Sequence, residues 1–179
     1  MRDWNGINIE PLPNKYELLL KKRKRDINLG IGAGKEEGVF TLIKNGELST
    51  ISKTYKKKLP NVISIKVNTM ANICKKYIPK DKKIQFCKID VEGGERDVLL
   101  GYDFEKYRPK VFCIESTKPG RDDIPCYDKW EGILLKNNYS FVYQYKINRF
   151  YIDNKIEGLR ERFKTINKTI KLYNLLNQE

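Results

Sequence analysis

Acidic residues end three of the strands that this sequence predicts. Glu10 closes a short alternating stretch near the start of the chain. Asp90 and Glu92 follow a near-continuous apolar run, and Glu115 follows a second one. Ligands of open α/β sheets bind beyond the carboxyl ends of strands, so these four acids are the candidate ligand-binding residues. Carboxylates there can bind the two hydroxyls of a ribose, attract a cation or accept a proton.

The position of each acid suggests its task. Glu10 closes a strand early in a nucleotide-type fold, where acids accept ribose hydroxyls. The glycines at 93–94, directly after Glu92, allow the backbone to approach a ligand closely. Glu115 ends a strand that we expect beside the Asp90 strand, so both acids could line one crevice.

Each acid also has a structural interpretation, because strand-end acids often cap the next helix or pair with lysines. The structural interpretation is strongest for Glu92 and Glu95, because both lie near a predicted helix N-terminus, where a negative charge is favourable anyway. The structural interpretation is weaker for Asp90, because a carboxylate that follows so apolar a strand needs either a function or a partner that compensates its charge.

Residue spacing argues against two other kinds of site. The chain has no histidine, and none of its four cysteines forms a CxxC pair, so we predict no zinc site, and no metal ligand is among the expected site residues. The segment GIGAGK at residues 30–35 looks like a phosphate loop. However, a P-loop needs glycine where this chain has Leu29, and it needs Ser or Thr where this chain has Glu36. A strand pattern follows the segment instead of a helix, so we predict a turn between strands.

Strand and helix patterns alternate along the chain, which favours an α/β sheet. The polar, basic segment 45–60 is predicted to be a surface excursion. Asn68 is expected to cap the second predicted helix. Predicted helices cover residues 15–24, 68–77 and about 127–134, and a further helix carries Val98, Leu99 and Leu100 and ends at Gly101. Predicted strands cover residues 7–9, 26–31, 39–43, 62–67, 84–89, 111–114, 140–145 and 149–152, the last two as a hairpin.

Composition restricts the class of protein. A chain of 179 residues with 40% hydrophobic residues is long and apolar enough for one domain with a real core. It contains no apolar run that could span a membrane and no signal-peptide core, and we expect a cytoplasmic protein with reduced cysteines. The formal net charge of +13 suits nucleic acid, but a genome bias toward AT-rich codons, which encode the abundant Lys, Asn, Ile and Tyr, explains it equally well. Nucleic acid is therefore not the partner we expect.

The tail at residues 154–179 is predicted to be a separate amphipathic helix. Its apolar residues follow an alternating three-and-four spacing, as in a short coiled-coil seam. The helix could pack on the protein's own sheet, which we favour, or form a homodimer or dock onto another domain. The residues are Ile156, Leu159, Phe163, Ile166, Ile170 and Tyr173.

Four motifs, in order, resemble the FkbM family of methyltransferases. GINIEPLP at residues 6–13 is similar to the family's second-strand motif, and KIDVEGGE at 88–95 with VLLG at 98–101 is similar to its most recognisable one. RPKV at 108–111 with IEST at 114–117 resembles the next strand. Residues 139–143 with 148–151 resemble the closing hairpin. The resemblance runs from residue 6 to residue 152.

The resemblance implies a Rossmann-like class I methyltransferase sheet in residues 1–153, with S-adenosylmethionine (SAM) as cofactor. Family members mostly methylate hydroxyls of sugars or small metabolites, so a glycan or small-molecule acceptor is expected. By this resemblance Glu10 binds the SAM ribose, and Asp90 lies near the methionine part and the methyl group, with Glu92 beside it. Asp90 or Glu115 is the expected base, unless a lysine of lowered pKa serves. On ligand type alone, Asp90 and Glu92 could hold Mg²⁺.

One departure from the family motivates an alternative. The family's first strand and Gly-rich SAM loop should precede Glu10, yet only nine residues do. We therefore expect an N-terminally incomplete domain. The alternative function is a truncated or inactive methyltransferase-like domain that acts as an interaction module.

Overall fold

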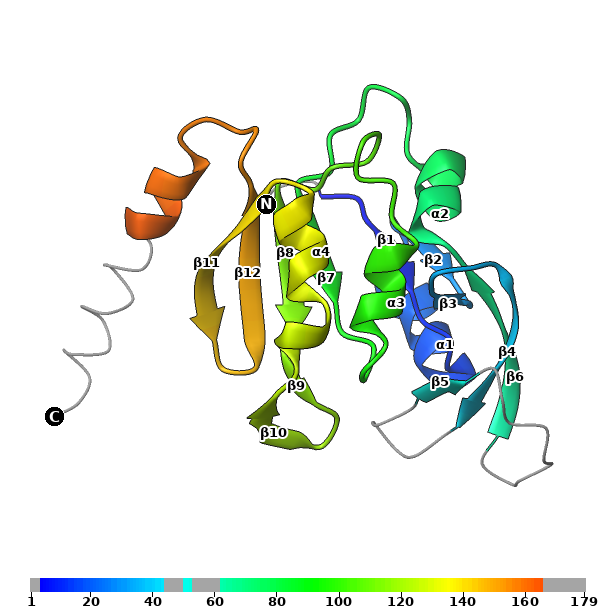
Figure 1. Ribbon diagram of the computed structural model, residues 1–179. Helices are drawn as coiled ribbons and strands as arrows, with labels where there is room; N and C mark the ends of the chain where they lie inside the picture. Colours follow the sequence, from blue (N-terminus) through cyan, green and yellow to red (C-terminus); the bar gives the residue numbers. More distant parts are fainter. Residues whose placement is uncertain (1–3, 44–49, 53–61, 166–179) are drawn as a thin grey trace, which may run out of the picture. The chain divides into compact units, whose positions relative to one another are not determined.

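The computed structural model describes residues 4–43, 50–52 and 62–165 and shows a mixed α/β fold (Figure 1). The chain divides into two compact units. The first comprises Met1–Lys82 and Val91–Asp103, and the second comprises Lys83–Asp90 and Phe104–Glu179. Among the described residues, no helix is long and apolar enough to span a membrane.

The first unit contains two sheets. In one, β1 (Ile7–Ile9) pairs in parallel with β2 (Ile27–Leu29), and α1 (Pro13–Lys22) connects them. Helix α1 begins at a proline, whose fixed φ and missing N–H suit the first helical position. The other sheet has the order β3-β6-β4-β5. Its strands are β3 (Gly32–Ala33), β4 (Gly38–Ile43), β5 (Thr50–Ser52) and β6 (Val62–Asn68).

Two helices complete the first unit, α2 (Met70–Tyr77) and α3 (Glu95–Leu100). The predicted cap of α2 was wrong by one residue: Thr69 is the N-cap and accepts a hydrogen bond from the Asn72 amide, while Asn68 still ends β6. Gly101 ends α3 as predicted, and its N–H bonds back to the helix. An apolar cluster of Leu12, Leu42, Ile65 and Val67 forms part of the core.

The second unit is built on one four-stranded sheet with the order β11-β12-β8-β7. Strands β7 and β8 are parallel, and the predicted hairpin of β11 and β12 continues the sheet in antiparallel pairing. A small hairpin, β9 with β10, follows β8. The strands are β7 (Phe86–Ile89), β8 (Val111–Glu115), β9 (Thr117–Lys118), β10 (Arg121–Pro125), β11 (Tyr139–Tyr145) and β12 (Asn148–Asp153). A 3-10 turn, η1 (Tyr127–Lys129), and α4 (Glu131–Lys136) precede the hairpin.

Aromatic residues dominate the core of the second unit. Phe112 of β8 is fully buried, and its ring meets the Tyr139 ring edge-on at 5.1 Å between centroids. Trp130, just before α4, contacts the Tyr151 ring in the same way at 5.7 Å. Such edge-to-face pairs add about 0.5–1.5 kcal/mol to the gain from burial alone. They hold β8 and β12 at fixed positions in the sheet.

A buried ion pair joins the start of β8 to the end of β12. The Arg108 guanidinium donates to both carboxylate oxygens of Asp153, at 2.9 and 2.6 Å. It also donates to the backbone carbonyls of Phe104 and Asn137, each at 3.0 Å. Burial opposes ionisation of Asp153, but the hydrogen bonds from Arg108 and the Lys155 amide outweigh it and lower the Asp153 pKa.

A second buried arginine ties β12 to α4. The Arg149 guanidinium lies 3.8 Å from the centroid of the Tyr127 ring and 4.0 Å from that of Phe141. It donates to Glu131 Oε1 at 2.9 Å, and the Tyr151 hydroxyl donates to the same oxygen at 2.7 Å. Cation–π contacts of this kind are strongest where water is excluded. The network therefore fixes β12, the neighbour of β8.

Several sequence predictions extend into residues that the structure does not describe. In the predicted excursion at 45–60, residues 50–52 form β5, and the rest lies outside the described residues. In the predicted tail, residues 159–165 are helical and 166–179 lie outside them. A role for the tail in dimerisation or docking stays a prediction. The GIGAGK segment contains the two residues of β3, and strand β4 follows it, so the segment opens no helix.

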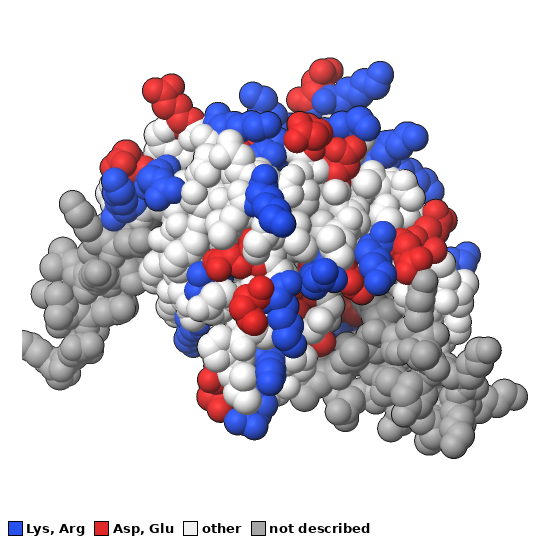
Figure 2. Space-filling model, in the orientation of Figure 1, with Lys and Arg blue, Asp and Glu red and all other residues white. Residues whose placement is uncertain are grey.

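On the face drawn in Figure 2, acidic side chains lie among the lysines and arginines. That face is therefore not an unbroken basic surface, although the chain carries a formal net charge of +13. Mixed charges of this kind are typical of a solvated surface, whereas a surface that binds a nucleic-acid backbone is predominantly basic.

Candidate functional site

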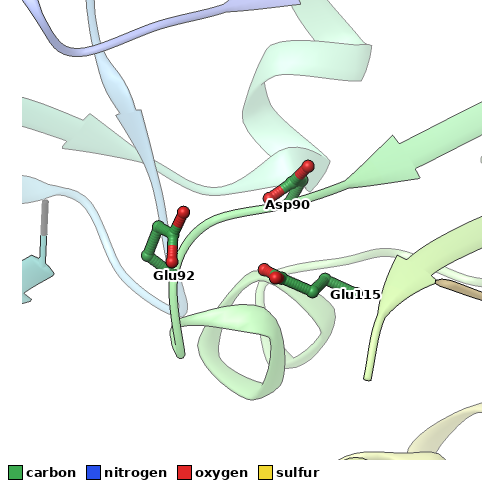
Figure 3. Close-up of side chains that lie close together, drawn as sticks. All are labelled: Asp90, Glu92 and Glu115. Carbon is green, nitrogen blue, oxygen red and sulfur yellow. The ribbon is translucent and has the colours of Figure 1, made fainter. Parts of the chain in front are cut away.

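Asp90 and Glu115 come together at the carboxyl ends of two adjacent parallel strands. Ile89 of β7 pairs with Ile114 of β8, so the next residue on each strand is an acid at the same end of the sheet. Figure 3 shows the Asp90, Glu92 and Glu115 carboxyl groups near one another, and one oxygen from each lies within 4.8 Å of the others. The sequence-based prediction that the strand-end acids of β7 and β8 are neighbours agrees with this geometry.

The two strand-end acids differ in environment. The Asp90 side chain is 39% exposed, whereas Glu115 is only 6% exposed. An exposed carboxylate can meet a ligand directly, while a buried one is held by its surroundings. Asp90 is therefore the acid better placed to meet a ligand, and Glu115 is the more firmly enclosed of the two.

Lys88 is part of the same group, and the sequence reasoning did not include it. Its Nζ donates to Asp90 Oδ2 at 2.7 Å. This hydrogen bond, opposed by partial burial and helped by the charges of Asp90, Cys113 and Glu115, raises the Lys88 pKa. The signal was present in the sequence: residues two apart on a strand lie on the same face, so Lys88 and Asp90 had to be neighbours.

The loop after Asp90 is held by Glu95, the first residue of α3. The buried Glu95 carboxylate accepts hydrogen bonds from the backbone amides of Val91 and Gly93, at 3.3 and 3.1 Å. Gly93 has a φ of 94° and Glu92 a φ of 54°, both in the left-handed region. A side chain strains that region, so glycine suits position 93. Glu95 thus shapes the loop, as the structural interpretation of that acid proposed.

Glu10 lies in the first unit, directly after β1. Its Oε1 accepts a hydrogen bond from the Leu12 amide at 2.8 Å, and its own amide donates to the Leu29 carbonyl at 3.0 Å. The side chain therefore shapes the turn that leads from β1 into α1. This contact engages one of its two carboxylate oxygens.

Carboxylate oxygens are the donors that Mg²⁺ and Ca²⁺ prefer. In the group of Asp90, Glu92 and Glu115, however, the ammonium of Lys88 already contacts one oxygen of Asp90. An ammonium and a divalent cation at the same carboxylate repel each other. We therefore assign no metal to this group.

Comparison with known proteins gives one match. A family model described as the methyltransferase FkbM domain matches residues 1–141, which include β7, β8 and all four predicted site acids. No curated protein matches the chain significantly, and no solved structure does.

Proposed function

This chain belongs to the FkbM family of methyltransferases, and we propose that it uses SAM to methylate a hydroxyl group of a sugar, a glycan or a small metabolite. The observation that carries the proposal is the pair of acids, Asp90 and Glu115, at the carboxyl ends of adjacent parallel strands. A Rossmann-like class I sheet is also part of the proposal. The parallel pair β7 and β8, extended by the antiparallel hairpin β11–β12, supports it.

The acids suit a positively charged cofactor. When bound, SAM supplies a methyl group: the acceptor oxygen bonds to the methyl carbon, the sulfur–carbon bond breaks, and the hydroxyl proton passes to a protein base. Asp90 and Glu115 provide negative charge on the side where a cation would be held. Alignment of the acceptor and exclusion of water are then the main contributions of the protein.

A carboxylate is the better base than the nearby lysine. Asp90 keeps Oδ1 available while Oδ2 accepts the hydrogen bond from Lys88. Lys88 holds its proton more firmly than a free lysine because its pKa is raised, so it does not accept a proton near neutral pH. We therefore propose Asp90 as the base, with Glu115 behind it, and we do not propose Lys88 for that role.

Glu10 is proposed to bind the SAM ribose through the carboxylate oxygen that does not contact Leu12. The contact with Leu12 makes the choice of variant important. Glu10→Ala would also disturb the turn into α1, whereas Glu10→Gln keeps a side-chain oxygen for the Leu12 amide. A drop in SAM affinity in Glu10→Gln would therefore report on the ligand rather than on folding. Glu92, next to Asp90 in the loop, is proposed to contribute to the same cofactor site.

The test is SAM binding followed by methyl transfer. We would measure SAM binding by calorimetry, and transfer of a labelled methyl group to a panel of mono- and oligosaccharides and hydroxylated metabolites. Asp90→Asn should lower transfer by at least about 100-fold, as expected for loss of a general base. Asp123→Asn is the matched control, because Asp123 also pairs with a basic side chain two residues away but is exposed on β10. Full activity in Asp90→Asn would refute the assignment of the base.

We further propose that the protein is cytoplasmic. None of the four cysteines, all of which the structure describes, forms a disulfide, which is usual for proteins of a reducing compartment. Labelling of the native protein in intact cells with a membrane-impermeant and a permeant thiol reagent would test this. Reaction with the permeant reagent alone is the expected result.

A further inference from the structure

A run of basic residues covers the end of α1 and the turn into β2. Residues 21–25 have the sequence KKRKR, and all five are exposed. From residue 15 to residue 26 the chain has six basic side chains against two acidic ones. One of the two acids, Asp26, pairs with Arg23 at 2.8 Å, and its side chain is only 5% exposed. The outer surface of this turn is therefore positively charged.

Large apolar side chains are exposed on the same helix. Leu18 and Leu20 are 50% and 47% exposed, and none of the ten residues of α1 is buried. Residues three and four apart on a helix are neighbours, so Leu18 lies beside Lys21 and Lys22. Leu20 precedes the same two lysines in the last turn of α1. The end of the helix thus presents apolar and basic side chains together.

Trp4 lies at the same end of this unit's parallel sheet. The Gly6 amide donates to Asp26 Oδ1 at 3.1 Å, and the Gly6 carbonyl accepts from the Ile27 amide at 2.9 Å. Trp4 precedes Gly6 by two residues, so its Cα lies within about 7 Å of the Gly6 Cα. Its side chain is 53% exposed. An indole ring, with an apolar body and one polar N–H, suits the boundary between lipid headgroups and hydrocarbon.

We propose that these residues form a lipid-binding face, made of Trp4, Leu18, Leu20 and the basic residues 21–25, that attaches the protein to a membrane surface rich in anionic phospholipids. The basic side chains meet the headgroups, and the three apolar ones insert among them. The phosphates of a nucleic acid would use the charges but would give the two leucines no role. The face lies at the start of β1 and Glu10 follows its end, so attachment leaves the carboxyl end of that strand accessible.

The first experiment measures binding of the full chain to sedimented vesicles at about 0.1 M salt. Vesicles of phosphatidylcholine mixed with phosphatidylglycerol should bind the protein, and vesicles of pure phosphatidylcholine should not. Each basic residue near an anionic surface increases partitioning about fivefold. Lys21→Gln/Lys22→Gln/Lys24→Gln should therefore lower the partition coefficient about 100-fold. This variant retains Arg23, which pairs with Asp26, so the turn keeps its ion pair.

The matched control is Lys75→Gln/Lys80→Gln/Lys82→Gln. It removes the same charge from three exposed lysines of the same unit, one of them in the last turn of α2. This control should bind the mixed vesicles as the wild-type protein does.

The second experiment tests insertion of the apolar side chains. Bromine-labelled lipid in the mixed vesicles should quench the fluorescence of Trp4, whereas Trp130 is only 2% exposed and lies in the core of the second unit. Trp4→Phe should abolish the quenching, which assigns the signal to Trp4. Leu18→Gln/Leu20→Gln should lower the partition coefficient about tenfold, because half-exposed leucines lose contact with lipid. Leu135→Gln, at an equally exposed leucine of α4, should have no effect.

Three results would overturn the inference. The first is absence of binding to the mixed vesicles, or an equal loss in the lysine control. The second is binding without quenching of Trp4, which would mean that charge alone attaches the protein. The third is tighter binding of the same basic residues to poly(U) RNA than to the vesicles, which would make this face a nucleic-acid surface. None of these measurements involves SAM, so their outcome is independent of the proposed methyl transfer.

Discussion

The ion pair between Arg108 and Asp153 gives the most quantitative prediction about stability. Arg108→Met removes a guanidinium that makes four hydrogen bonds and leaves Asp153 charged in a site where its side chain is only 5% exposed. Removing one partner of a buried pair costs about 3–5 kcal/mol, because the remaining charge is left uncompensated. The free energy of unfolding should fall by that amount.

The assay is urea unfolding of the full chain, with the free energy taken from the midpoint and the slope. Arg108→Met/Asp153→Asn should lose clearly less than the sum of the two single variants, because the double variant buries no unpaired charge. Arg121→Met is the control: Arg121 and Asp123 form an ion pair at 2.8 Å, but both side chains are at least 60% exposed. That variant should leave the free energy of unfolding nearly unchanged.

Two results would refute this reasoning. One is a loss below about 1 kcal/mol in Arg108→Met, which would mean that Asp153 finds water or another partner at little cost. The other is strict additivity in the double variant, which would mean that the two side chains stabilise the protein independently.

Two further predictions concern a glycine and a carboxylate. Gly101→Ala should destabilise the protein by about 1–3 kcal/mol or more, because a Cβ there would overlap the Gly34 carbonyl oxygen. Gly132→Ala, with nothing within 4 Å of its new Cβ inside α4, should instead stabilise it by about 0.5–1 kcal/mol, and equal effects in thermal melts would contradict the argument. The lowered pKa of Asp153 means that its ionised form adds stability above its unfolded pKa of about 3.9, and that this is lost as pH falls through the lower folded pKa. Melting temperatures between about pH 6 and pH 3 should therefore fall more steeply in the wild-type protein than in Asp153→Asn, and parallel curves would exclude Asp153 as the source.

Much of the site's framework could be predicted from the sequence, because parallel strands bring their carboxyl ends to one edge. This reasoning predicts that Asp90 lies beside Glu115, as β7 and β8 place them. It missed Lys88, because basic residues are so frequent in this chain that a single lysine at a strand end could not be distinguished from the others. It also could not decide between a ligand and a structural role for Glu95, since that depends on how a five-residue loop folds back on itself.

Two features, the β9–β10 hairpin and the N-cap of α2, were not predicted, each for its own physical reason. The β9–β10 hairpin has no apolar alternation, and Arg121, Asp122 and Asp123 are all exposed, so no hydrophobic face indicates a strand. Thr69 rather than Asn68 caps α2, because β6 extends one residue further than its β-branched stretch. Both residue types are good N-caps, and the residue at which β6 ends determines which of them caps the helix.

The position of β12 has a consequence for how this protein is made. Strand β12 lies between β11 and β8, although it is the last of these three strands to be synthesised. As the chain leaves the ribosome, β8 therefore has one edge open until residues 148–153 emerge, and β11 has no partner in this sheet until then. Open strand edges pair readily with other chains. Slow translation or a pause just before residue 148 should thus expose the nascent protein to aggregation.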